Sequence, residues 1–70
     1  MDISNRPQII GEKLKALRGE KTQQEIANSL GITAMAISQY ERGERVPNDE
    51  IKMKIADYFG KRVDEIFFAS

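Results

Sequence analysis

Residues 22–43 read TQQEIANSLGITAMAISQYERG and predict two short helices joined by a tight turn. Thr22 and Glu25 have the spacing of a capping box, in which a hydroxyl and a carboxylate bond unpaired backbone N–H groups at a helix start. Ala27 is small where two crossing helices would meet, and Gly31 suits the turn. Apolar residues follow at helical spacing and predict a shared core of Ile26, Leu30, Ile32, Ile37 and Tyr40. The segment 23–41 therefore fits a helix-turn-helix, and an ordinary αα-hairpin of a small bundle is the alternative.

The rest of the chain predicts three more helices. The first helix begins near Pro7, because proline suits the first turn of a helix. Its apolar face consists of Ile10, Leu14 and Leu17, and Gly11 within it weakens the helix. Another is capped by Asn48 and has a core stripe of Ile51, Ile55 and Phe59, and a short last helix spans 63–68. Glycines that suit helix ends are Gly19, Gly31, Gly43 and Gly60. The chain is therefore predicted to be all-α, a compact bundle of five short helices forming a single domain over residues 1–70.

Composition limits the classes of function. The 70 residues are 40% hydrophobic and 31% charged, as expected for one globular domain. The chain has no Cys and no His, which excludes disulfides and thiolate metal sites and removes the commonest general base. No motif of a phosphate loop, a metal site or a nucleophile–base pair is present, so we expect no enzyme, no metal and no cofactor. The N-terminal segment has no apolar leader, and no apolar run approaches the roughly 20 residues that span a bilayer, so we expect a cytoplasmic protein without a membrane partner.

The charge balance bears on nucleic-acid binding. Eleven basic and eleven acidic residues give a formal net charge of zero. Any affinity for DNA must then come from the local arrangement of side chains, because the overall charge attracts no phosphate.

The order of several short motifs resembles the Cro and lambda-repressor-like (XRE) family of bacterial and phage regulators. The likeness extends over about 10–67, and its motifs are Leu17-Arg18, Thr22-Gln23-Gln24-Glu25-Ile26-Ala27, Leu30-Gly31-Ile32, Ile37-Ser38-Gln39-Tyr40-Glu41-Arg42-Gly43, Pro47, Ile55-Ala56 and Val63-Asp64-Glu65-Ile66-Phe67. The link Gly19-Glu20-Lys21 departs from the family, because it is shorter and lacks an apolar plug. The resemblance implies a lambda-repressor-like fold, sequence-specific binding to a double-stranded DNA operator, and transcriptional regulation as a repressor.

The resemblance also implies which residues read bases. In the family, the N-terminal half of the second motif helix enters the major groove. The matching positions here are Thr33, Ala34, Met35, Ser38 and Gln39. Gln39 is the strongest candidate, because its amide can both donate to and accept from adenine, whereas Ala34 and Met35 can contact a thymine methyl. An A·T-rich half-site is therefore expected. The alternative for Met35 is a partly exposed filler or a dimer contact.

Further positions match the family's contacts with the DNA backbone. Gln23 would bind a phosphate through its amide and the helix N-terminus, and Lys21, Arg42 and Arg45 would approach the sugar-phosphate chain. The alternative for all of them is an ordinary solvated side chain. Arg18 and Glu41 match a family ion pair within the fold, which we interpret as structural.

The C-terminal residues Ile66, Phe67 and Phe68 predict a homodimer. Adjacent helical residues point about 100° apart, so the three cannot all face one core, and Phe68 is the expected exposed member. Two copies would also read half-sites about one DNA turn apart. An alternative function is a protein-interaction or antitoxin-type module that uses the same fold.

Overall fold

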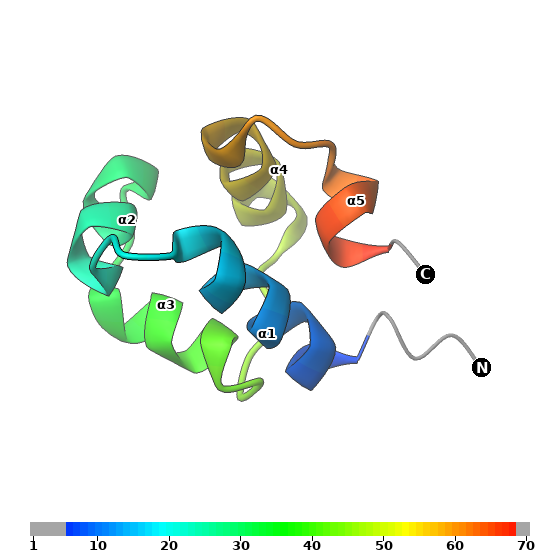
Figure 1. The fold of residues 1–70 in the computed structure, drawn as a ribbon, viewed down its shortest axis with the longest axis horizontal. Coiled ribbons are helices and arrows are strands. Elements are labelled where there is room, and N and C mark those ends of the chain that lie inside the picture. The colour runs from blue at the N-terminus through cyan, green and yellow to red at the C-terminus, as the bar shows by residue number, and fades with distance from the viewer. Residues whose placement is uncertain (1–5, 69–70) are drawn as a thin grey trace.

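The computed structural model describes residues 6–68, and residues 1–5 and 69–70 lie outside that range. The predicted domain, residues 1–70, therefore includes residues outside the described range. The N-terminal segment for which we expect no apolar leader also lies mostly outside it. Within 6–68 the chain forms helices and no strand. The helices are α1 (Pro7–Arg18), α2 (Gln23–Leu30), α3 (Ala34–Glu41), α4 (Asp49–Phe59) and α5 (Val63–Phe67), as Figure 1 shows. The all-α prediction is confirmed, and the last helix ends at Phe67, one residue earlier than predicted.

Side-chain oxygens cap three helix starts, and these include the predicted caps Thr22 and Asn48. The oxygens of Thr22, Thr33 and Asn48 accept backbone N–H bonds at 3.0, 3.1 and 2.9 Å, at the starts of α2, α3 and α4. At α2 the Glu25 N–H donates to the Thr22 hydroxyl, which is one of the two bonds of the predicted capping box. The second bond, from the Thr22 N–H to the Glu25 carboxylate, is not among the hydrogen bonds of the described residues. The shortened link before Thr22 leaves the start of α2 where the sequence predicted it.

The turn between α2 and α3 depends on Gly31. Its φ of 71° lies in the left-handed region that glycine adopts without steric cost. The next N–H, that of Ile32, donates to the Ala27 carbonyl at 3.0 Å, which closes the end of α2. Ile32 then packs against the core. Three residues, 31–33, separate the end of α2 from the start of α3.

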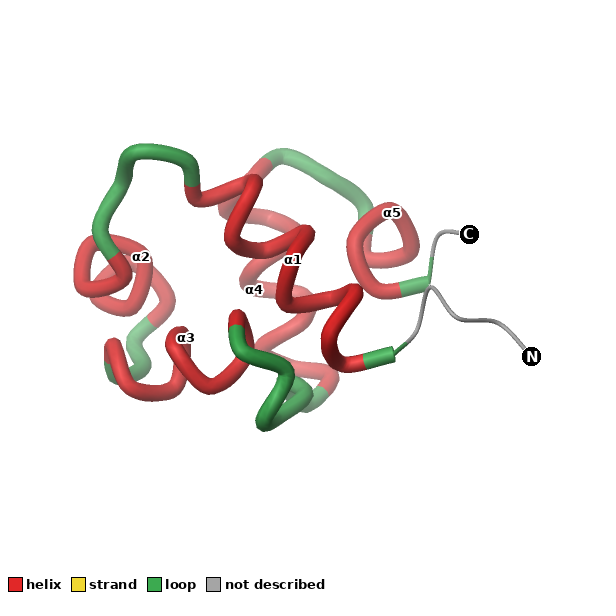
Figure 2. Tube along the Cα trace, turned by 60° about the horizontal axis from the view of Figure 1, so that its bottom comes forward, coloured by secondary structure: helices red, strands yellow, loops and turns green. Residues whose placement is uncertain are grey.

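The helices surround one apolar core. Helix α3 packs against α1 and α2, α4 packs against α2 and α5, and α5 also packs against α1 (Figures 1 and 2). The buried members are Ile10, Leu14, Ile26, Ala27, Leu30, Ile37, Tyr40, Ile55, Ala56, Ile66 and Phe67, and Leu17, Ile51 and Phe59 pack against them partly exposed. Every residue predicted for the core therefore contacts it.

Gly11 has a role that its helix propensity did not indicate. A Cβ at this position would lie 2.4 Å from the Glu41 carbonyl oxygen and 2.6 Å from that of Tyr40. These are backbone atoms, which cannot move aside like a flexible side chain. Gly11 therefore permits the close approach of α1 to the end of α3, in exchange for weaker helix propensity.

Two further properties concern the described residues. None of their helices is long and apolar enough to cross a membrane. Among the same residues, no group of three or more acidic side chains gathers where it could hold a metal ion.

Candidate nucleic-acid interface

The predicted base-reading residues lie on α3 and its cap. Among residues 6–68, Met35 is the most exposed of the large apolar residues, at 69%. Thr33 is exposed and its hydroxyl oxygen caps the helix, while Ser38 and Gln39 are half-buried. Ala34 is half-buried and packs partly against the core, so it offers less exposed surface than Met35.

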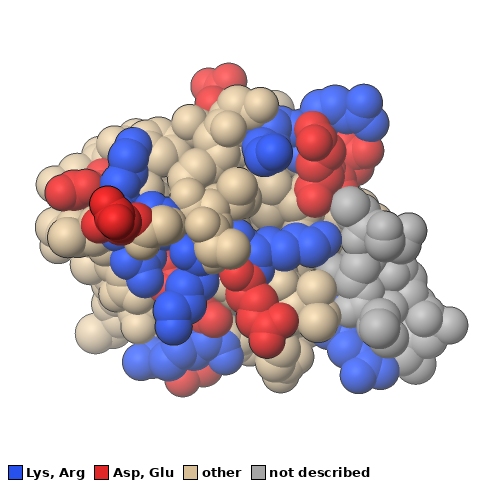
Figure 3. Space-filling view, viewed as in Figure 1, with Lys and Arg blue, Asp and Glu red and all other residues tan. Residues whose placement is uncertain are grey.

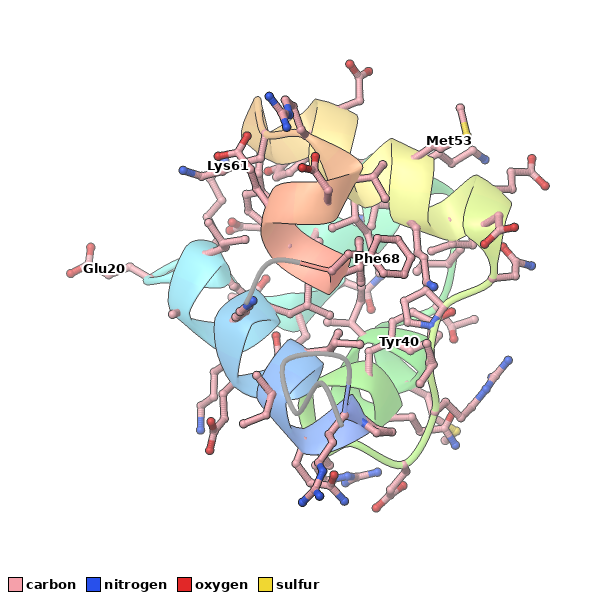
Figure 4. All side chains as sticks on the ribbon, turned by 90° about the vertical axis from the view of Figure 1, so that its right-hand side faces the viewer. Glu20, Tyr40, Met53, Lys61 and Phe68 are labelled. Atoms are coloured by element: carbon pink, nitrogen blue, oxygen red, sulfur yellow. The ribbon has the colours of Figure 1, made fainter. Side chains whose placement is uncertain are left out.

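The segment after α3 folds back onto Gln39. The Gln39 backbone carbonyl accepts N–H bonds from Glu44 at 2.9 Å and from Arg45 at 3.3 Å. The Arg45 side chain donates from Nη1 to Gln39 Oε1 at 3.3 Å. Its guanidinium lies 5.9 Å from the centre of the Tyr40 ring, within the range of a cation–π contact. In Figure 4, Tyr40 points from α3 into the bundle, where it is buried. Arg45 thus contacts two consecutive residues of α3, Gln39 and Tyr40.

Two other predicted phosphate contacts have partners within the protein. Arg42 pairs with Glu44 at 3.1 Å, and both side chains are more than half exposed, at 58% and 54%. The Lys21 ammonium donates to the Tyr58 hydroxyl at 2.7 Å, and this hydrogen bond raises the pKa of the amine. Both cations remain at the surface. No local spacing could have indicated Tyr58, which is 37 residues from Lys21.

The Glu41 carboxylate joins three helices. Arg18 donates to it twice, from Nε to Oε2 at 2.7 Å and from Nη2 to Oε1 at 3.0 Å. Gln23 adds a bond from Nε2 to Oε1 at 3.1 Å, which the sequence did not predict. The Glu41 side chain is only 6% exposed and that of Arg18 18%, and the hydrogen bond to Glu41 raises the pKa of Arg18. Because a carboxamide nitrogen has two N–H donors, one of those on Gln23 is not used in the bond to Glu41.

Charges of both signs are mixed on one face of the molecule. On the face drawn in Figure 3, Lys and Arg side chains lie among Asp and Glu side chains and form no large area of one sign. This distribution agrees with the net charge of zero. Attraction to a phosphate chain on this face would therefore act over short distances.

Comparisons with known proteins agree with this geometry. Residues 14–66 match a family model described as helix-turn-helix. An uncharacterised HTH-type transcriptional regulator of Methanocaldococcus jannaschii is 35% identical over 57 residues, which are 79% of this chain and 86% of the relative. The uncharacterised HTH-type transcriptional regulator YazB of Bacillus subtilis is 34% identical over 61 residues, which are 84% and 88% of the two chains.

A solved structure extends the likeness to a DNA complex. The crystal structure of the P22 c2 repressor with a synthetic operator superimposes with a TM-score of 0.82 and 27% identity. The match covers 87% of this chain and 96% of that one. The likeness to that repressor therefore extends well beyond the α2–α3 unit.

Proposed function

Because the chain belongs to the helix-turn-helix (XRE) family, we propose that it is a transcriptional repressor that binds a double-stranded DNA operator with α3 in the major groove. The observation that carries this proposal is the likeness to the P22 c2 repressor, whose structure contains operator DNA. The matching relatives are named as transcriptional regulators, which points to DNA binding and not to an enzyme. Such a protein would act in the cytoplasm, where the DNA of a bacterium lies.

The reading surface consists of α3 and its cap. Gln39 is the main polar reader, Met35 offers its exposed side chain to a thymine methyl, and Thr33, Ala34 and Ser38 complete the contact with base edges. The exposure of Met35 and the position of Gln39 on the same short helix support this assignment.

The DNA backbone would be held from both ends of the motif. Gln23 at the start of α2 would donate its remaining amide N–H to a phosphate, as would the backbone at this helix end. Lys21, Arg42 and Arg45 are exposed and charged on the adjoining segments. Their intramolecular partners orient these cations and leave other N–H donors available.

A homodimer would bring two copies of α3 to one operator. Ile66 and Phe67 are buried, at 2% and 0%, whereas Phe68 is 49% exposed, as the sequence predicted. Figure 4 places Phe68 at the end of α5 and shows Met53 pointing outward from α4. We assign the dimer contact to the C-terminal helix and this exposed ring. Light scattering at tens of micromolar should give twice the chain mass of 8.0 kDa, and a monomer that stays monomeric on DNA would contradict the assignment.

Selection from a pool of randomised duplexes tests the proposed function. The purified chain should enrich one sequence family, and the enriched duplex should shift in a gel at lower protein concentration than a scrambled one. An interaction or antitoxin-type module, which the neutral charge would suit, should enrich no sequence. Gln39→Ala should lower affinity for the enriched duplex by about 1–3 kcal/mol and leave non-specific binding almost unchanged.

A further inference from the structure

We propose that Arg45 determines which base Gln39 reads, by holding the carboxamide oxygen of Gln39 beside its guanidinium and leaving the N–H donors of the pair as the main groups for the DNA. The inference rests on the proposed function and deepens it. Its geometric basis is the bond of 3.3 Å from Arg45 Nη1 to Gln39 Oε1.

The chemistry of the two side chains fixes the orientation of the amide. A guanidinium has five N–H donors and no acceptor, so only the oxygen of Gln39 can meet it. The Gln39 nitrogen, with two donors, then faces away from that bond. Arg45 is held in place independently, because its backbone N–H donates to the Gln39 carbonyl at 3.3 Å and its guanidinium lies 5.9 Å from the Tyr40 ring centre. The loop therefore presents Arg45 to Gln39 before any DNA is bound.

This arrangement changes the expected base. Recognition of adenine by a glutamine needs the oxygen as acceptor for N6 and the nitrogen as donor to N7. One lone pair of the Gln39 oxygen is taken by Arg45, and the guanidinium lies beside that oxygen, so the pair presents mainly donors, from the Gln39 nitrogen and from Arg45. Guanine presents two acceptors, N7 and O6, on its major-groove edge, and it suits a pair of side chains that mainly donate. The intact pair of Arg45 and Gln39 should therefore select G·C where an isolated glutamine would select A·T.

Arg42 provides a matched control in the same loop. Its guanidinium pairs with Glu44 at 3.1 Å, and it has no described bond to Gln39. A phosphate contact by Arg42 or by the other N–H groups of Arg45 would strengthen all sequences alike. A change in base preference thus separates the action through Gln39 from simple charge.

The experiment uses the duplex selected by the wild-type chain. Gln39→Ala first identifies the contacted base pair, as the one at which discrimination is lost. Duplexes with G·C and A·T at that pair are then titrated with wild type, Arg45→Ala and Arg42→Ala. We expect wild type to bind the G·C duplex about tenfold tighter, within the range of one good base contact. Arg45→Ala should lose or reverse this preference, and Arg42→Ala should keep it while binding both duplexes more weakly.

Two results would overturn the inference. The first is a wild-type preference for A·T at the contacted pair, and the second is an Arg45→Ala variant that weakens both duplexes equally. If Gln39→Ala loses discrimination at no pair, the inference also fails, although an enriched sequence would still support DNA binding. Failure of the wild-type chain to enrich any sequence would instead refute the proposed function.

Discussion

Removal of the Arg18 side chain should destabilise the fold strongly, because it leaves the Glu41 carboxylate nearly buried without its cation. That carboxylate is 6% exposed and accepts three hydrogen bonds, two of them from Arg18 at 2.7 and 3.0 Å. Loss of one partner of a buried ion pair costs about 3–5 kcal/mol. Arg18→Met should lie at the low end, about 3 kcal/mol, since Arg18 is 18% exposed and water can enter its place. The bond from Gln23 would also remain.

A second substitution should recover most of that loss. In the double variant Arg18→Met, Glu41→Leu no charge is left in the interior, and similar apolar side chains often replace such a pair without cost. Glu41 is also the last residue of α3, where the helix dipole disfavours a negative charge. Gln23 is half-buried and can bond water instead of Glu41. We therefore expect the double variant to lie within about 1 kcal/mol of wild type.

Urea denaturation followed by circular dichroism measures both quantities, at one protein concentration so that any dimer contributes equally. A cost of Arg18→Met below about 0.5 kcal/mol, the range of an exposed pair, would contradict a buried pair. A double variant no more stable than the single one would show that the cost does not come from an unpaired charge.

Three further predictions use other features of the structure. Gly11→Ala should destabilise by about 2–3 kcal/mol in urea denaturation despite better helix propensity, because its Cβ meets backbone oxygens. Gly60→Ala, with open space around its Cβ and a left-handed φ of 66°, should cost only the left-handed strain of about 1 kcal/mol. Equal losses would contradict this. Contact with about four to eight phosphates per dimer predicts that log K for DNA binding falls with log salt concentration at a slope of roughly −4 to −7. Arg42→Ala should flatten this slope by about one unit per lost contact, which titrations at several salt concentrations would test. Two hydrogen bonds from the Arg62 guanidinium hold the pKa of Asp64 below its ordinary 3.8. The pair therefore stabilises the fold above pH 3.8, and its contribution is lost as the pH falls through the lowered pKa. In NMR titrations Arg62→Ala should raise the pKa of Asp64, and an unchanged pKa would refute the contact.

The sequence by itself determined the helices, their caps and the core. Thr22, Thr33 and Asn48 mark helix starts through bonds that span three residues, and the turn at Gly31 needs only its own backbone freedom. The buried faces follow from helical periodicity. These features arise from interactions between near neighbours in the chain, so the order of residues is sufficient to predict them.

Only the tertiary structure decided how the polar side chains of the interface are paired. Gln23 reaches Glu41 across 18 residues and Lys21 reaches Tyr58 across 37, and no periodicity encodes such contacts. The bond from Arg45 to Gln39 depends on how the loop after α3 folds back. The need for Gly11 was equally hidden, because it arises from the distance between α1 and the end of α3. Each of these contacts requires relative positions that are set only when the whole core packs.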